Sequence, residues 1–169
     1  MTSATLSSKD STGIMGYVDR VRNVWRDVGY QSLKDAEMAI SSVAGFGKCW
    51  PMRGSRGRLT IQLSEAIHVE SVSLEHPDRA ILLNDGVSAP KDFSVIGYRK
   101  GWTPLQATVG DVLVSNAEYS LDGKNIQDFP VAEQFLRNVY THITLEVESN
   151  HGEGAYTCLY RFRVHGSPS

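Results

Sequence analysis

The sequence has little of what would assign it quickly to a large functional class. It holds only two cysteines and six prolines, and its 17 basic side chains nearly balance 19 acidic ones, for a formal charge of −2. No stretch approaches the roughly 20 consecutive apolar residues of a membrane-spanning helix. Without a basic excess, the chain also lacks the counterion release that supplies most nucleic-acid affinity. We therefore expect this fragment itself to contact neither membranes nor nucleic acids.

Catalytic signatures are also missing. The chain has no GxSxG elbow, no GxxxxGK[ST] loop, no HExxH pair and no GxGxxG turn. Its five histidines show no paired ligand spacing beside Cys49 and Cys158, so a zinc site is not expected. From cysteine usage alone, the pair is either two buried thiols or one disulfide. We predict that the protein is not an enzyme.

The N-terminal region differs in pattern from the rest. Residues 1–13 are rich in Ser, Thr and Gly, and we interpret them as a disordered start or an expression remnant. From Ile14 to Val28, apolar residues recur at four-three-four-three spacing along one stripe of a helix. This stripe indicates either a short amphipathic helix packed on its own domain or the end of a coiled coil. We predict helix for residues 14–30 and a separate domain for residues 31–169.

After Cys49 the period changes to the alternation of β-strands. Residues 131–140 fit either strand ends around a loop, which we favour, or one helical face. Short strands between turn residues predict an all-β fold, a compact antiparallel β-sandwich preceded by the short helix or coiled-coil segment. Alternation is visible at residues 58–63, 72–74, 93–97, 143–147 and, as one continuous strand, 158–164.

Four motifs carry a resemblance to a known family. They are GKCW at residues 47–50, LEH at 74–76, SAPKDF at 88–93 and YTCLYRFRVHG at 156–166. Their order and spacing over residues 38–168 closely resemble the SUN domain family. The resemblance implies a nuclear-envelope protein whose SUN domain lies in the perinuclear space, forms a homotrimer and binds the C-terminal luminal tails of KASH proteins. The resulting bridge, the LINC complex, couples the nucleus to the cytoskeleton for nuclear anchorage or migration.

The resemblance also implies roles for individual residues. By its motifs, His76, Tyr156 and Tyr160 line the pocket for the last residue of the KASH tail, and Ser88 lies in the loop that closes over it. Cys49 and Cys158 match the family's disulfide, which fits an oxidising lumen. The stripe from Ile14 to Val28 becomes the end of a trimeric stalk, because Ile and Val at the seam are compatible with three strands. Arg161 and Arg163 are expected on the solvated face of their strand, as solvated charges or contacts between protomers and not as ligands for the tail.

Family members further hold a monovalent cation, K⁺ or Na⁺, on backbone carbonyls before the first disulfide cysteine. Lys48 stands where the family has Asn, so its ammonium group must point away from a bound cation. Residues 29–38 are too few for the β-hairpin lid that the family carries ahead of this loop. The aligned carbonyls belong to Met38, Ser41, Val43 and Lys48, with Tyr160 nearby.

Two other functions remain open. A β-sandwich of this kind also suits a carbohydrate-binding module, in which Trp50, Tyr98 and Trp102 would supply stacking surfaces. The domain could equally be a trimeric structural scaffold that binds no tail.

Overall fold

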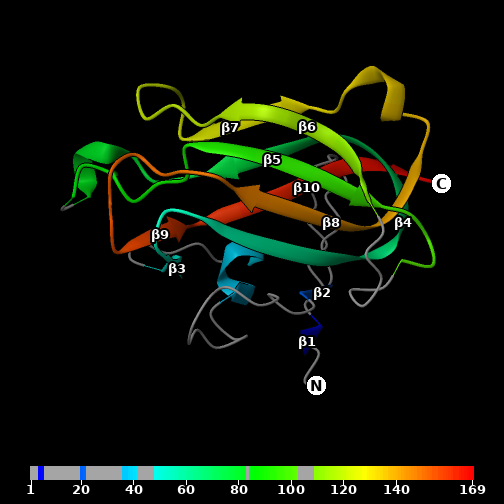
Figure 1. Cartoon of the computed structure of the whole chain (residues 1–169), viewed down its shortest axis with the longest axis horizontal. Helices are drawn as coiled ribbons and strands as arrows, with labels where there is room; N and C mark the ends of the chain where they lie inside the picture. The colour runs from blue at the N-terminus through cyan, green and yellow to red at the C-terminus, as the bar shows by residue number, and fades with distance from the viewer. Residues whose placement is uncertain (1–3, 6–19, 22–35, 42–47, 83, 103–108) are drawn as a thin grey trace.

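The computed structural model describes residues 4–5, 20–21, 36–41, 48–82, 84–102 and 109–169. Strands dominate this part of the chain (Figure 1). They are β1 (Ala4–Thr5), β2 (Arg20–Val21), β3 (Trp50–Arg53), β4 (Gly57–Glu75), β5 (Asp92–Tyr98), β6 (Asp111–Glu118), β7 (Ile126–Pro130), β8 (Val139–Val147), β9 (Tyr156–Leu159) and β10 (Arg161–Pro168). Short 3₁₀ helices are η1 (Glu37–Ile40), η2 (Arg79–Ile81) and η3 (Glu133–Phe135). Within these residues, no helix has the length and apolar character needed to cross a membrane.

Strand β4 organises the fold because its two halves pair with different partners. Its first half pairs with β2 and β8, and β8 continues through β5 to β6. Its second half lies between β10 and β7. The register shifts between Gln62 and Ile67, where the strand passes from one set of partners to the other. All of these pairs are antiparallel, and β3 pairs with β9 in a separate two-stranded sheet.

The core lies between these layers and follows the alternation of the strands. Leu59 and Ile61 of β4 face inward with Ile143 and Leu145 of β8, and all four are fully buried. The two-residue period therefore sends one face of each strand to the core, as the sequence predicts. The largest fully buried side chains are Trp50, Tyr140, Phe93, Phe162, Met52, Leu59, Ile61, Ile67, Leu113, Ile143, Leu145 and Leu159.

A bulge interrupts the pairing of β10 with β4 between His165 and Gly166. A Cβ atom on Gly166 would lie 2.0 Å from the backbone oxygen of His68. Since backbone cannot yield as a side chain does, only glycine fits this close approach. The bulge keeps the end of β10 paired with β4, next to the point where the register between β4 and β8 shifts.

The predicted all-β fold and antiparallel sandwich are confirmed, with some differences in the strands. The runs at residues 58–63 and 72–74 belong to one strand, β4, and the run at 158–164 is two strands that meet at Tyr160. Residues 131–140 hold η3 between two strand ends, as favoured. Strands β3, β6 and β7 were not predicted, because β6 does not alternate regularly and Pro51 interrupts the apolar pattern of β3.

The N-terminal expectations fall mostly outside the described residues. The structure describes four residues there, which form the antiparallel pair β1 and β2, and β2 also pairs with β4. At Ala4 and Thr5 the expected disordered start is therefore wrong, and at Arg20 and Val21 the expected helix is wrong. Backbone pairing along β4 supplies hydrogen bonds that an isolated short helix would lack. The rest of residues 1–30, and residues 31–35, lie outside the described part of the chain.

Candidate functional site

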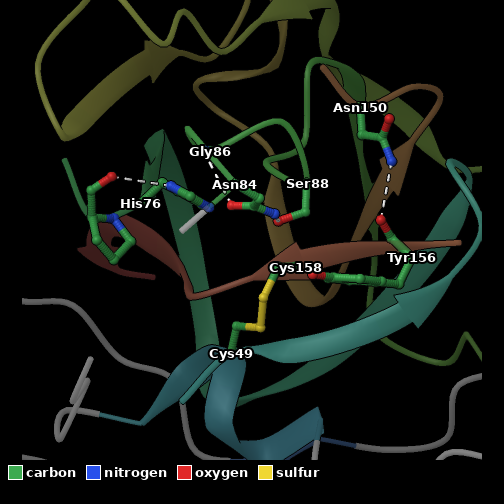
Figure 2. Close-up of a disulfide and its surroundings, with 9 residues drawn as sticks. Cys49, His76, Asn84, Gly86, Ser88, Asn150, Tyr156 and Cys158 are labelled. Carbon is green, nitrogen blue, oxygen red and sulfur yellow. Dashed lines mark hydrogen bonds between the residues drawn. A yellow bond between two sulfur atoms is a disulfide. The ribbon is translucent and has the colours of Figure 1, made fainter. Parts of the chain in front are cut away.

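The structure brings the four predicted tail-binding residues to one end of the sandwich. His76 directly follows β4, Ser88 lies between η2 and β5, Tyr156 begins β9, and Tyr160 separates β9 from β10. Figure 2 shows Ser88 next to the disulfide, with His76 on one side and Tyr156 on the other. The backbone nitrogen of Cys158 donates to the backbone oxygen of Ser88 at 2.7 Å. Residues far apart in sequence therefore meet at one site.

His76 is the most buried of the four, with 2% of its surface exposed. Its Nδ1 lies 3.1 Å from the backbone oxygen of Pro77, and its ring meets the Tyr160 ring edge-on at 4.8 Å. A carbonyl oxygen only accepts, so Nδ1 carries the proton. Burial lowers the pKa of His76 to about 4, although the Pro77 hydrogen bond opposes this shift. At neutral pH the buried Nε2 is therefore a hydrogen-bond acceptor, with no partner in the described part of the chain.

A tight turn positions Ser88. The side-chain oxygen of Asn84 accepts from the backbone nitrogen of Gly86 at 3.3 Å, and its Nδ2 donates to Ser88 Oγ at 3.2 Å. Asp85 and Gly86 have φ angles of 52° and 76°, so the turn uses the left-handed region that glycine adopts without strain. Because Ser88 Oγ accepts from Asn84, its own proton is available to a ligand, although the residue is only 4% exposed.

Asn150 holds the start of β9, and it lies outside all four sequence motifs. Its Nδ2 lies within hydrogen-bond distance of the backbone oxygens of Glu153 and Tyr156, at 2.7 and 3.2 Å, and of Thr157 Oγ1, at 3.0 Å. These contacts orient the half-buried Tyr156. An Asn followed by Gly two residues later is a turn signal that could have identified it.

Cys49 and Cys158 form the disulfide that the resemblance implies, with Cα atoms 5.4 Å apart. The bond joins the residue that precedes β3 to the middle of β9, next to the β3–β9 pairing. It therefore anchors the strand that carries Tyr156.

The proposed cation loop is described only in part. Val43 lies outside the described residues, and the Met38 carbonyl accepts from the Ser41 nitrogen at 3.4 Å. A carbonyl has a second lone pair, so this bond leaves Met38 able to ligate a cation. Lys48 is exposed, so water can solvate its ammonium group. The Met38 carbonyl is thus compatible with a carbonyl-held cation, and the described chain has no cluster of His, Cys, Asp or Glu suited to a metal ion.

The expectation for Arg161 is wrong, because this residue is only 7% exposed. Its Nη1 lies 3.2 Å from Glu75 Oε2, and Arg163 Nη2 lies 3.3 Å from the same oxygen. Arg161 and Glu75 are direct partners in the β10–β4 register. Arg161 directly follows Tyr160 in sequence, and Glu75 directly precedes His76. This ion pair therefore helps to fix the positions of the His76 and Tyr160 rings.

Of the three aromatic residues expected to stack on a carbohydrate, one is buried and cannot do so. Trp50 is 1% exposed in the core, so it offers no face to a ligand. Tyr98 and Trp102 stack on each other, with centroids 4.1 Å apart, beside a cavity of about 410 Å³. This cavity lies at the end of β5, whereas Ser88 lies in the loop that leads into the start of β5.

Comparisons with known proteins give the chain a family. The family model described as Sad1/UNC-like C-terminal matches residues 30–168. SUN domain-containing protein 2 of Arabidopsis thaliana is 36% identical over 133 residues, which are 79% of this chain and 29% of that protein. SUN domain-containing protein 1 of Homo sapiens is 36% identical over 123 residues, covering 72% of this chain and 15% of that protein. The chain thus spans less than a third of either relative.

Among solved structures, a chitosan-binding module from a Paenibacillus chitosanase/glucanase superposes with a TM-score of 0.55 at 14% identity. The match covers 78% of this chain and 84% of the module. At that identity the likeness shows a shared sandwich fold. Sequence similarity to the SUN proteins is far higher and covers all four motifs, and on this evidence the chain belongs to the Sad1/UNC-like C-terminal family, the SUN domains.

Proposed function

We propose that this domain binds the C-terminal luminal tail of KASH proteins in the perinuclear space. It acts as a mechanical tether of the LINC complex, not as an enzyme, and couples the nucleus to the cytoskeleton for anchorage or migration. Membership of the SUN family supports the proposal. In this proposal, the membrane anchor belongs to a part of the protein outside this chain.

One observation carries the proposal at the level of the site. The fold brings His76, Ser88 and Tyr156 together around the disulfide (Figure 2), and the Tyr160 ring, directly after β9, contacts the His76 ring. A terminal carboxylate requires hydrogen-bond donors, and the Ser88 hydroxyl and the half-buried Tyr156 phenol supply them. His76 contributes an acceptor, because its donor nitrogen faces Pro77.

The proposed assembly is a homotrimer, held by contacts between SUN domains. Within one chain, His76, Ser88 and Tyr160 are each at most 5% exposed. A groove between protomers would place the tail along this buried layer, so that a neighbouring chain supplies the second wall. A K⁺ or Na⁺ ion on the carbonyls of Met38, Ser41, Val43 and Lys48, near Tyr160, would order the adjoining loop.

A titration with peptides tests the tail-binding role. Labelled KASH tails that differ only in a free or amidated C-terminus are added to the oxidised protein and followed by anisotropy. We expect the free acid to bind at least about tenfold more tightly, because charge-assisted hydrogen bonds are lost on amidation. Tyr156→Phe should weaken the acid form, whereas Tyr98→Phe, the same change at the opposite end, should not.

Equal affinity for the acid and the amide would contradict the carboxylate pocket. If the protein is folded and trimeric but binds neither peptide, the domain is instead a structural scaffold.

A further inference from the structure

A cavity of about 410 Å³ lies at the end of the sandwich away from the proposed tail site. It is lined by residues 97–102, at and after the end of β5, and by residues 109–111, at the start of β6. Strand β5 runs seven residues from the loop of Ser88 to Tyr98, which separates the two sites by about 20 Å. The cavity is therefore distinct from the tail site, and its volume is at the small end of the range for ligand pockets.

Two aromatic rings form one wall of the cavity. Tyr98 and Trp102 stack with centroids 4.1 Å apart and planes 23° from parallel. Trp102 also meets the His142 ring, with centroids 5.1 Å apart, and His142 is the cross-strand partner of Tyr98. The wall is thus anchored to two strands, β5 and β8. A rigid aromatic surface of this kind favours a ligand with an apolar face.

Close backbone packing keeps this wall in place. A Cβ atom on Gly110 would lie 2.8 Å from Cε1 of Tyr98 and 2.4 Å from Cγ2 of Ile96. Glycine at this position therefore lets the chain just before β6 approach the Ile96 and Tyr98 side chains closely.

A charged pair forms the polar side of the cavity. Arg99 donates to Asp111 Oδ2 from Nε at 3.2 Å and from Nη2 at 2.9 Å. The same oxygen accepts from Asn138 Nδ2 at 3.2 Å and from the Tyr140 hydroxyl at 2.8 Å. Burial alone would raise the pKa of Asp111, but these hydrogen bonds lower it below its ordinary value, so the group stays ionised.

The pair leaves both a donor and an acceptor for a ligand. Within the described part of the chain, the hydrogen bonds to Asp111 all use Oδ2, so Oδ1 keeps its lone pairs. Arg99 and Lys100 are exposed beside it and offer N–H donors. Groups that donate and accept at once, such as neighbouring hydroxyls, match this arrangement.

The charges argue against other small ligands. An anion would approach Asp111, and a cation would approach Arg99 and Lys100, so neither gains from both halves of the pair. A peptide backbone binds best along an unpaired strand edge. Here Gly97 and Asp111 are paired with each other, so the facing edges of β5 and β6 are not open to a peptide. A neutral polyhydroxylated ring satisfies the aromatic wall and the charged pair together.

We propose that this cavity is a second binding site, for one or two rings of a neutral saccharide. The apolar face of the sugar stacks on the Tyr98–Trp102 wall, and neighbouring hydroxyls bond to Arg99 and Asp111. This site lies far from the tail residues, so it operates independently of tail binding. A domain of this kind joins a tether at one end to glycan recognition at the other.

Isothermal titration of the whole chain with neutral disaccharides tests the proposal. The probes are cellobiose, lactose, mannobiose and N,N′-diacetylchitobiose, with sialyllactose and an acidic peptide as charged comparisons, each at up to about 10 mM. We expect saturable binding of at least one neutral disaccharide. Trp102→Ala and Arg99→Ala should each weaken it by about tenfold or more, while Tyr156→Phe, at the tail site, should leave it unchanged.

The thermal unfolding curve of each variant shows whether it is folded. Because Trp102→Ala removes part of the wall, Trp102→Phe provides a second, milder variant that should retain partial affinity. No binding of any neutral probe by the folded wild-type chain would overturn the proposal. Tighter binding of sialyllactose or the acidic peptide, or saccharide binding that survives both Trp102→Ala and Arg99→Ala, would also overturn it.

Discussion

His76 is a neutral hydrogen-bond acceptor at neutral pH, in spite of its place in a site that we expect to receive a carboxylate. Burial removes the water that would solvate an imidazolium, and no carboxylate among the described residues forms an ion pair with the ring. The Pro77 carbonyl fixes the proton on Nδ1. The donors that we propose for a tail are therefore Ser88, which Asn84 contacts, and Tyr156, whose backbone oxygen Asn150 contacts.

The burial of His76 predicts a loss of stability in mild acid. Its pKa is about 4 when folded and about 6.5 when unfolded, so between these values only the unfolded chain takes up a proton. The contribution of His76 to the free energy of unfolding is therefore complete above pH 6.5, and about 3 kcal/mol of it is lost as the pH drops to 4. Burial also lowers the pKa of His165, which adds a loss in the same direction.

Urea denaturation at several pH values between 7 and 4 measures this effect. His76→Gln should flatten the dependence and retain only the share from His165 and other groups. A variant with the same slope as the wild type would show that His76 does not titrate in this way.

At the scale of strands, the β4–β10 pairing places Glu75 opposite Arg161, next to the His76 and Tyr160 rings. The side chain of Arg161 is 9% exposed and that of Glu75 is 26% exposed, so their ion pair is shielded from water. Removing the Glu75 carboxylate takes a charged partner from both Arg161 and Arg163, and the loss costs most at the buried Arg161. The pair thus stabilises the junction that separates β9 from β10.

Glu75→Gln should destabilise the protein by about 2 kcal/mol or more, because the buried Arg161 loses a charged partner. Glu146→Gln is the matched control. Glu146 pairs with Arg58 between β8 and β4, but the Arg58 side chain is 53% exposed, and surface pairs contribute less than about 1 kcal/mol. Chemical denaturation of the two variants measures the difference. Equal losses in both would contradict a special role for the Glu75 pair.

The disulfide acts at the scale of the whole molecule. It closes a loop of 109 positions and joins the chain before β3 to a strand near the C-terminus. The sheet β3–β9 has only two strands, which are weakly stable by themselves. The covalent link therefore ties the two strands of this small sheet to each other, and so stabilises the strand that begins with Tyr156.

Reduction should lower the free energy of unfolding by about 5 kcal/mol in the loop-entropy model. Thermal unfolding with and without a phosphine reductant measures the change. A Cys49→Ala/Cys158→Ala double variant should unfold at the lower temperature in both conditions, which separates the loss of the bond from side effects of the reductant. A reduced wild type as stable as the oxidised one would contradict this role.

The sequence by itself determined the fold class, most core strands and the family. The alternation of apolar and polar residues in β5 and β8 indicates directly that one face of each strand is buried, because successive strand residues point to opposite sides. The four motifs carry the family membership without any geometry, and they name the residues that the fold gathers around the disulfide. The roles of these residues in tail and cation binding stay predictions until peptide and ion titrations test them.

Only the tertiary structure decided where the last strand breaks and what surrounds it. Residues 158–164 alternate as one strand, but Cys158 pairs with β3 and Arg161 pairs with Glu75, so the chain must change sheets at Tyr160. The same register buries Arg161, which periodicity alone places in solvent. The cavity beside Trp102 depends likewise on residues of β5, β6 and β8 that meet only in the folded sheet. Strand period is a local property of the chain, whereas register and pairing are set by contacts between distant residues.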